Sequence, residues 1–117
     1  MTERKAMIKT LDKLVSQIVR KRGRCEMCNR TDTLQAAHIF SRRNFNVRFD
    51  LGNLLCLCYR CHFHIAHKEP VRFTQFVKEK LGEVKFKQLQ IRADTSAKGQ
   101  DLKLIKLYLS IVIRKLK

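Results

Sequence analysis

The sequence predicts an α+β fold, mostly helical, in which a small ββα unit lies between N- and C-terminal helices. Apolar residues recur at helical spacing near both ends of the 117-residue chain. Between them, two short apolar runs flank a basic loop, and a Cys-x-x-Cys pair stands on either side of this segment. We expect one domain, residues 1–117, whose core is small enough to need a metal or disulfides for stability.

The chain is strongly basic, with 26 Lys and Arg residues against 10 Asp and Glu residues and a formal net charge of +16 at pH 7. The excess runs through the whole chain, so we expect a polyanion as partner. A solvated basic surface without a ligand is the alternative. No stretch approaches the roughly 20 apolar residues that cross a bilayer. The first residues lack the apolar core of a secretion signal, so we expect a cytoplasmic protein with no membrane partner.

Residues 1–22 predict a basic amphipathic helix. Its apolar residues recur at helical spacing, at Met7, Leu11, Leu14, Val15 and Ile18. The segment ends in the basic run Arg20–Arg22, just before Gly23. We expect the apolar stripe to cover the core, and the basic face is a candidate phosphate contact.

Residues 23–69 predict the ββα core. A strand is expected around Leu34–Phe40, followed by the basic loop Ser41–Asn44. A second strand is expected at Leu54–Leu57, and a helix begins near Tyr59.

Two more helices are expected within residues 70–93. Pro70 suits the first turn of a helix, and Gly82 is well placed to end it. The second helix is less distinct, because Val84 and Phe86 alternate as they would in a strand.

Residues 101–117 predict a C-terminal helix that follows a polar linker at 94–100, with Asp101 as its cap. One apolar stripe contains Leu102, Ile105, Leu109, Val112 and Leu116, and a second contains Leu104, Leu107 and Ile111. A helix that is apolar on two sides needs two neighbours, and we expect it to pack within the chain. The alternatives are a homodimer through this helix, or an adaptor that uses it to bind another protein.

The two Cys-x-x-Cys pairs predict one structural zinc ion, held by Cys25, Cys28, Cys58 and Cys61. Each pair supplies two thiolates from one tight turn, and four thiolates leave no open position for substrate. A redox Cys-x-x-Cys is the alternative. The fifth cysteine, Cys56, is expected to be a small buried thiol and not a ligand.

Three polar residues are expected to converge beside this metal. His38 lies on the first strand, Asn53 opens the second, and His62 follows the last cysteine on the helix. A hairpin followed by a helix brings these positions together. Any one histidine alone is more often structural, but three polar residues framed by the cysteines indicate a site.

These residues resemble the HNH nuclease family, through Cys25-x-x-Cys28, Ala37-His38-Ile39, Asn53-Leu54-Leu55 and Cys58-x-x-Cys61-His62. More narrowly, the segment from Ala36 to His62 and the pattern after His67 are similar to small phage HNH proteins and to NinG-type phage recombination nucleases. The resemblance covers residues 25–93 and does not include the two end helices.

The resemblance implies a zinc-stapled ββα-metal finger that nicks DNA or cuts branched DNA, with a catalytic Mg²⁺ or Mn²⁺ ion. It implies that His38 is the general base, that Asn53 ties the hairpin loop, and that His62 is a ligand of the catalytic ion. If the chain is phage-encoded, the host cytoplasm is its compartment.

Two positions depart from the family pattern. Many relatives have Asp or His before the base, where this chain has Ala37, and a second helix ligand four residues after the first, where it has Ala66. His67 is the nearest substitute ligand and His64 the other candidate. The catalytic ion is therefore expected to have few protein ligands. The alternative is a non-catalytic, zinc-bound nucleic-acid-binding module on a degenerate HNH scaffold.

Arginines between the two strands are candidate nucleic-acid ligands. Arg42, Arg43 and Arg48 match the family's arginine-rich stretch, and guanidinium groups bind phosphate through two hydrogen bonds. A merely solvated loop is the alternative. Asp50 either pairs with one of these arginines or ends the loop.

Overall fold

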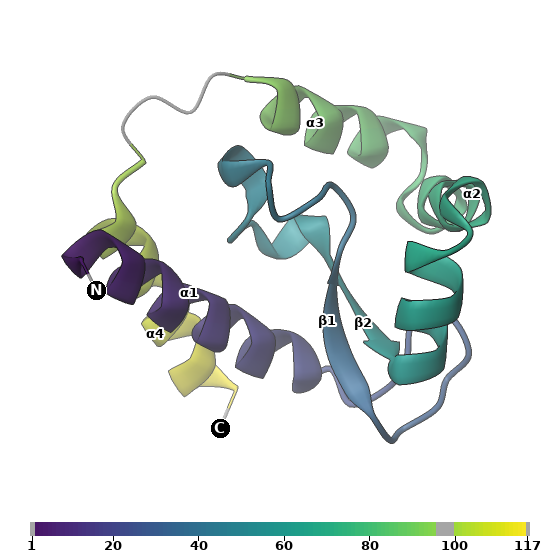
Figure 1. Ribbon diagram of the computed structural model, residues 1–117, viewed down its shortest axis with the longest axis horizontal. Helices are drawn as coiled ribbons and strands as arrows, with labels where there is room; N and C mark the ends of the chain where they lie inside the picture. The colour runs from purple at the N-terminus through teal and green to yellow at the C-terminus, as the bar shows by residue number, and fades with distance from the viewer. Residues whose placement is uncertain (1, 96–99, 117) are drawn as a thin grey trace.

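A short hairpin stands between two groups of helices (Figure 1). The computed structural model describes residues 2–95 and 100–116. Along the chain the elements are α1 (Glu3–Arg20), β1 (Leu34–His38), the 3₁₀ turns η1 (Phe45–Val47) and η2 (Leu51–Asn53), β2 (Leu54–Cys58), η3 (Cys61–His67), α2 (Pro70–Leu81), α3 (Glu83–Asp94) and α4 (Leu102–Lys115).

The hairpin is antiparallel, and its register pairs Leu34 with Cys58 at one end and His38 with Leu54 at the other. β1 was expected to reach Phe40, but it ends at His38. The reason is Asn53, whose side chain binds both the amide and the carbonyl of Phe40 and so turns the chain out of the ladder. The α+β class and the hairpin predicted from the sequence are confirmed.

Two of the three hydrophobic cores lie on opposite sides of the hairpin, and a smaller third joins α3 to the loop after β1. The first joins α1, α4 and the hairpin through Leu11, Val15, Leu54 and Leu109. The second joins the hairpin, η3 and α2, and it contains three of the Cys-x-x-Cys sulfurs together with Phe73 and Val77. α1 and α4 lie side by side on one side of the hairpin, with α2 and α3 on the other (Figure 1).

α1 begins as the sequence predicts and ends slightly earlier. Thr2 caps it by accepting a hydrogen bond from the Lys5 amide. The predicted apolar stripe faces the core, since Leu11, Val15 and Ile18 are buried. The helix stops at Arg20, and Gly23 follows with a positive φ of 79°, a conformation that glycine adopts readily.

η3 is a π-helix, in which hydrogen bonds join residues five apart instead of four. The sequence predicted a helix near Tyr59, but apolar periodicity cannot distinguish a π-helix from an α-helix in so short a segment. The consequence is geometric: residues five positions apart lie on one face of η3.

The helices after η3 are also confirmed. Pro70 occupies the first turn of α2, and Gly82 ends it with a φ of 82°. Residues 83–94 form a helix and not a strand, with Leu89 and Ala93 buried against Val47 of the hairpin loop. Part of the predicted linker, residues 96–99, lies outside the described residues.

α4 packs on α1 with one of its two apolar stripes. Asp101 caps it by accepting from the Leu104 amide, and Leu109 is fully buried. The second stripe is exposed, with Leu107 at 55 %. Packing within the chain is thus observed for the first stripe only. Within residues 2–95 and 100–116, no helix has the length and apolar content needed to cross a membrane.

Truncating the buried stripe of α4 is expected to destabilise the protein. Leu109→Ala should lower the free energy of unfolding by about 2–5 kcal/mol, because it leaves a cavity between α4 and α1. The matched control is Leu107→Ala on the exposed stripe, for which we expect a change within about 0.5 kcal/mol. Urea unfolding measures both, and equal effects of the two variants would contradict the packing described.

Candidate metal centre and histidine cleft

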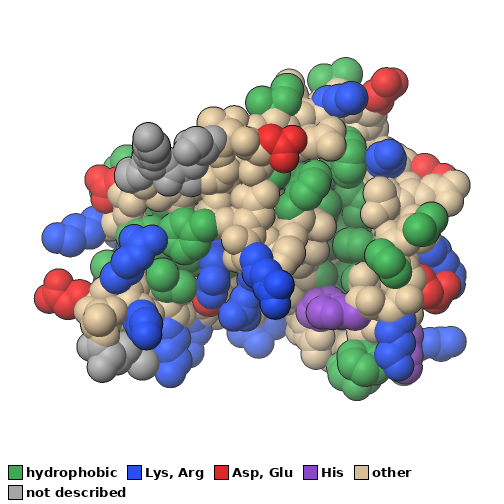
Figure 2. All heavy atoms as spheres, turned by 45° about the horizontal axis from the view of Figure 1, so that its top comes forward, with side chains coloured by type: hydrophobic (Ala, Val, Ile, Leu, Met, Phe, Trp, Pro, Cys, Tyr) green, Lys and Arg blue, Asp and Glu red, His purple; other side chains and the backbone are tan. Residues whose placement is uncertain are grey.

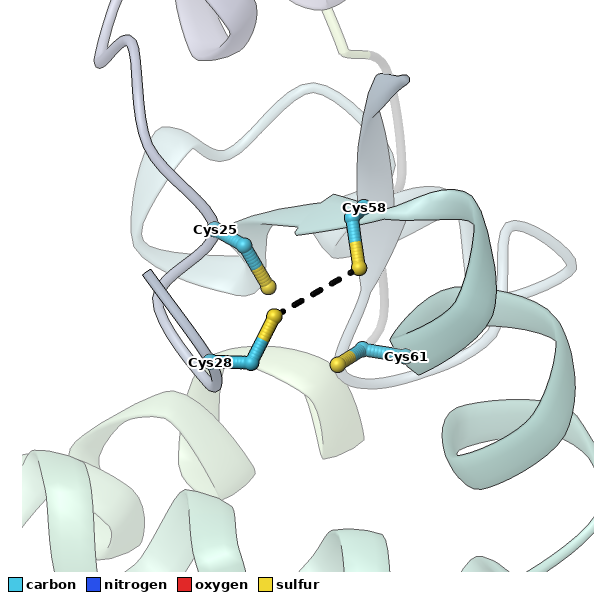
Figure 3. A group of neighbouring side chains, drawn as sticks. All are labelled: Cys25, Cys28, Cys58 and Cys61. Carbon is cyan, nitrogen blue, oxygen red and sulfur yellow. Dashed lines mark hydrogen bonds between the residues drawn. The ribbon is translucent and has the colours of Figure 1, made fainter. Parts of the chain in front are cut away.

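The four cysteines of the two Cys-x-x-Cys pairs meet in one cluster. Cys25 and Cys28 lie in the turn after α1, Cys58 ends β2, and Cys61 begins η3. Their sulfur atoms all lie within 4.8 Å of one another, and the side chains point toward a common centre (Figure 3). Cys28 Sγ and Cys58 Sγ are 3.6 Å apart.

This spacing fits a tetrahedral zinc ion. Zn–S bonds of about 2.3 Å place the sulfurs of a tetrahedral site about 3.8 Å apart. Three of the four cysteines are buried, and burial with neighbouring sulfurs raises the pKa of Cys61. Burial also acts to raise the pKa of Cys25, but hydrogen bonds from the backbone of Cys58, Cys28 and Met27 lower it to about 7. Close thiolates repel one another, so a cation would stabilise their charged form. The cluster is consistent with one structural zinc.

A glutamate inside the first cysteine turn braces the cluster. Glu26 Oε2 accepts from the Cys56 amide at 2.6 Å, and the Glu26 amide donates to the Cys56 carbonyl at 2.8 Å. Arg22 binds the same carboxylate at 2.9 Å. The turn is thereby fastened to β2 independently of any metal. Cys56 itself is buried and outside the cluster, as the sequence predicted.

The second feature is a cleft of about 650 Å³ between α1 and η3. α1 forms one wall, and the end of β1, the following loop and η3 form the others. It brings together His38, His62 and His67, which the sequence singled out, together with Arg42 and, from α1, Asp12 and Ser16. Asp12 and Ser16 lie outside the motif region and were not predicted.

His38 is held by the loop that follows it. Its Nε2 lies 3.1 Å from the carbonyl oxygen of Arg48, which can only accept, so Nε2 carries the proton and Nδ1 has a free lone pair. Burial lowers the pKa of His38 below its ordinary value of 6.5, and the charges of Arg42 and Arg48 act in the same direction. The imidazole is therefore neutral near pH 7.

His62 and His67 form a pair because η3 is a π-helix. The two residues are five apart, and their ring centroids are 4.7 Å apart. Gln35 on β1 accepts from Nδ1 of His62 at 2.7 Å, which leaves Nε2 of His62 unprotonated. Burial lowers the pKa of His62, and His67 lowers it further. No periodicity in the sequence signals the contact with Gln35.

Asn53 is fully buried and, unlike His38 and His62, does not line the cleft. Its Oδ1 accepts from the Phe40 amide at 2.8 Å, while its Nδ2 donates to the carbonyls of Phe40 and Val47. The Asn53 carbonyl also accepts from the Ile39 amide. This one side chain closes the loop that carries Arg48 and so holds the partner of His38.

The arginines of the loop have different surroundings. Arg42 lines the cleft, and both Arg42 and Arg43 are exposed. Arg48 instead forms two hydrogen bonds with Asp12 of α1, at 2.6 and 3.0 Å. The structure thus gives Arg48 a different partner from the phosphate expected from the sequence. Asp50 ends the loop by accepting from the Gly52 amide, and it pairs with Arg92.

The remaining sequence candidates lie away from the cleft or contribute nothing to it. His64 packs edge-on against Tyr59 and Phe63. Ala37 is fully buried in the second core. Among the residues that the structure describes, only the four cysteines bring three or more potential ligand atoms close together.

Basic side chains gather on part of the molecular surface. Figure 2 shows Lys and Arg side chains gathered in the lower half of the face that it draws, with fewer acidic ones among them.

Comparison with family models, with curated proteins and with solved structures finds no match for this chain.

Removing a cysteine ligand is expected to unfold the protein. We expect about one zinc per chain by mass spectrometry and elemental analysis. Cys58→Ser should lose it, because a structural zinc contributes roughly 10–16 kcal/mol, about the whole stability of a small domain. Cys56→Ala, at a buried thiol outside the cluster, should keep both zinc and fold. A zinc-free wild type with an unchanged melting temperature would contradict this prediction.

His38 is expected to titrate below pH 6.5, because its lowered pKa favours the neutral ring. As the pH falls, the ring should reach half protonation only below 6.5. NMR of the zinc-loaded protein measures this midpoint, and the spectrum of His38→Ala assigns the signal. A midpoint at or above 6.5 would show that His38 is not buried as described.

Proposed function

We propose that this protein is a metal-dependent endonuclease of the HNH type that hydrolyses DNA phosphodiester bonds, by nicking duplexes or cutting branched DNA. The observation that supports this most is the meeting of His38, His62 and His67 with Arg42 in one cleft. The net charge of +16 favours a polyanionic substrate.

In this proposal His38 is the general base. Its free Nδ1 takes a proton from a water molecule, the water oxygen attacks phosphorus, and the 3′ oxygen leaves. The base must be neutral to accept a proton, and the lowered pKa of His38 meets this condition. Arg48 holds the ring through its carbonyl oxygen and is a positioning residue.

His62 and His67 would hold the catalytic Mg²⁺ or Mn²⁺ ion, His62 through its unprotonated Nε2. Two nitrogen ligands leave the other positions to water and phosphate oxygens, since Ala37 supplies no carboxylate. Mg²⁺ prefers oxygen ligands, so of the two ions this imidazole pair fits the transition metal Mn²⁺ better. When bound, such an ion offsets negative charge on the phosphate and on the leaving oxygen. Arg42, exposed at the cleft, would bind a neighbouring phosphate.

A second candidate is a non-catalytic zinc-bound nucleic-acid-binding module on the same scaffold. Two observations favour it. Ala37 is enclosed in the core and offers no ligand, and the three histidines are not grouped as closely as the cysteines. It predicts tight binding of DNA without cleavage.

The test is cleavage of supercoiled plasmid and of a four-way junction with Mg²⁺, Mn²⁺ or EDTA. We expect metal-dependent nicking that His38→Ala reduces by about 10²–10⁴-fold, the usual contribution of a general base. The matched control is His64→Ala, on another face of η3, which should retain nicking.

Binding is measured alongside cleavage. His38→Ala should bind the same DNA as tightly as the wild type, since the residue acts in the chemical step. Cleavage by His38→Ala at the wild-type rate would exclude His38 as the base. Tight binding without cleavage by the wild type would instead support the non-catalytic module.

A further inference from the structure

Two aromatic side chains form an exposed stack beside the cleft. Tyr59 and Phe63 are 49 % and 41 % exposed. Their ring centroids are 5.6 Å apart and the ring planes differ by 6°, so the rings are nearly parallel. In the described part of the chain the only other exposed aromatic residue is Tyr108, on α4.

Several contacts hold this stack in place. The amide of Tyr59 donates to Thr33 Oγ1 at 3.2 Å. This bond joins the start of the helical segment to the residue that precedes β1. His64 packs edge-on against both rings. The Lys68 ammonium lies 4.7 Å from the centre of the Phe63 ring. The rings are therefore fixed although they are exposed.

The charges around the stack favour a nucleic acid over a protein as its ligand. Arg60 and Lys68 are exposed beside the rings. The acidic residues nearest in the sequence are already paired, Asp50 with Arg92 at 2.7 Å and Glu69 with Arg72 at 3.4 Å. Aromatic rings flanked by cations bind bases by stacking and phosphates by charge.

The π-helix relates this stack to the cleft. Residues five apart share a face of η3, so His62 and His67 lie on one face. Phe63 lies on the next, with Lys68, just beyond the end of η3, over its ring. Phe63 directly follows His62, which lines the cleft, so the stack and the cleft are neighbours along η3. Bases inside a continuous duplex are stacked on both sides and cannot reach the Phe63 ring.

We infer that Tyr59 and Phe63 form a stacking site for unpaired bases, which directs the cleft toward DNA with a single-stranded segment, such as a flap, gap or junction. This inference rests on the proposed DNA-binding function but not on catalysis. It concerns residues to which the HNH resemblance assigns no role.

The test compares three labelled probes of equal length by fluorescence anisotropy at one salt concentration: oligo(dT), an abasic strand, and a duplex. The abasic strand has the same phosphates and no bases. We expect Tyr59→Ala and Phe63→Ala each to weaken oligo(dT) binding by at least roughly fivefold, the effect of one lost stacked base. Binding of the abasic strand should change less than about twofold by the same reasoning.

Two control variants separate stacking from other effects. Tyr59→Phe keeps the ring and should bind oligo(dT) like the wild type. Tyr108→Ala removes an equally exposed tyrosine from α4 and should have no effect. Zinc content and circular dichroism establish that each variant is folded.

A second measurement does not require alanine variants. The chain has two tyrosines and no tryptophan, so Tyr108→Phe leaves Tyr59 as its only tyrosine emitter. Oligo(dT) should quench that emission and the abasic strand should not.

Three results would overturn the inference alone: equal wild-type affinity for oligo(dT) and the abasic strand, equal losses on all three probes, or no quenching. If the wild type bound none of the probes, the proposed DNA-binding function would itself be wrong, and the plasmid assay would show this separately.

Discussion

The four-cysteine cluster is the constraint on which the rest of the structure depends. It joins the turn after α1 to the junction of β2 and η3, so one ion would fix three segments at once. The hairpin alone is too short to be stable, and each of its two cores is small. Because η3 begins at Cys61, a member of the cluster, the orientation of its histidines depends on the position of the cluster.

The residues that form the cleft and hold its side chains come from several elements of the fold. α1 supplies Asp12, which holds Arg48, whose carbonyl oxygen in turn holds His38. Asn53 closes the loop between these residues and the second strand. The imidazole is thereby positioned by contacts from both sides of the hairpin. This explains how a short loop on a small protein can hold the His38 ring at the cleft with its Nδ1 lone pair free.

Much of this arrangement could be predicted from the sequence, for physical reasons. Paired cysteines at a two-residue spacing have few other uses in so basic a chain, and alternating or helical apolar patterns give the hairpin and the helices. Gly82 and Asp101 ended and began helices where their chemistry predicted.

Other features left no periodic signal. The contact of Gln35 with His62, the brace of Glu26 and the pairing of Arg48 with Asp12 join residues between 27 and 36 positions apart. Such contacts depend on the tertiary structure, and a single polar residue in the sequence gives no indication of its partner. The π-helix could not be predicted for a related reason. In a segment of only seven residues, the apolar pattern of a π-helix cannot be told from that of an α-helix.

The longer turn of the π-helix makes the contact between His62 and His67 depend on the number of residues between them. With α-helical hydrogen bonding, the segment would present a partner to His62 four positions later, where Ala66 stands, and His67 would point elsewhere. Deleting one residue between His62 and His67 would restore a four-residue spacing and allow an ordinary α-helix to present the same histidine pair. The histidine pair can thus form on a π-helix with a five-residue spacing or on an α-helix with a four-residue spacing. A one-residue deletion here would change the helix type, whereas a deletion in a loop would only shorten the loop.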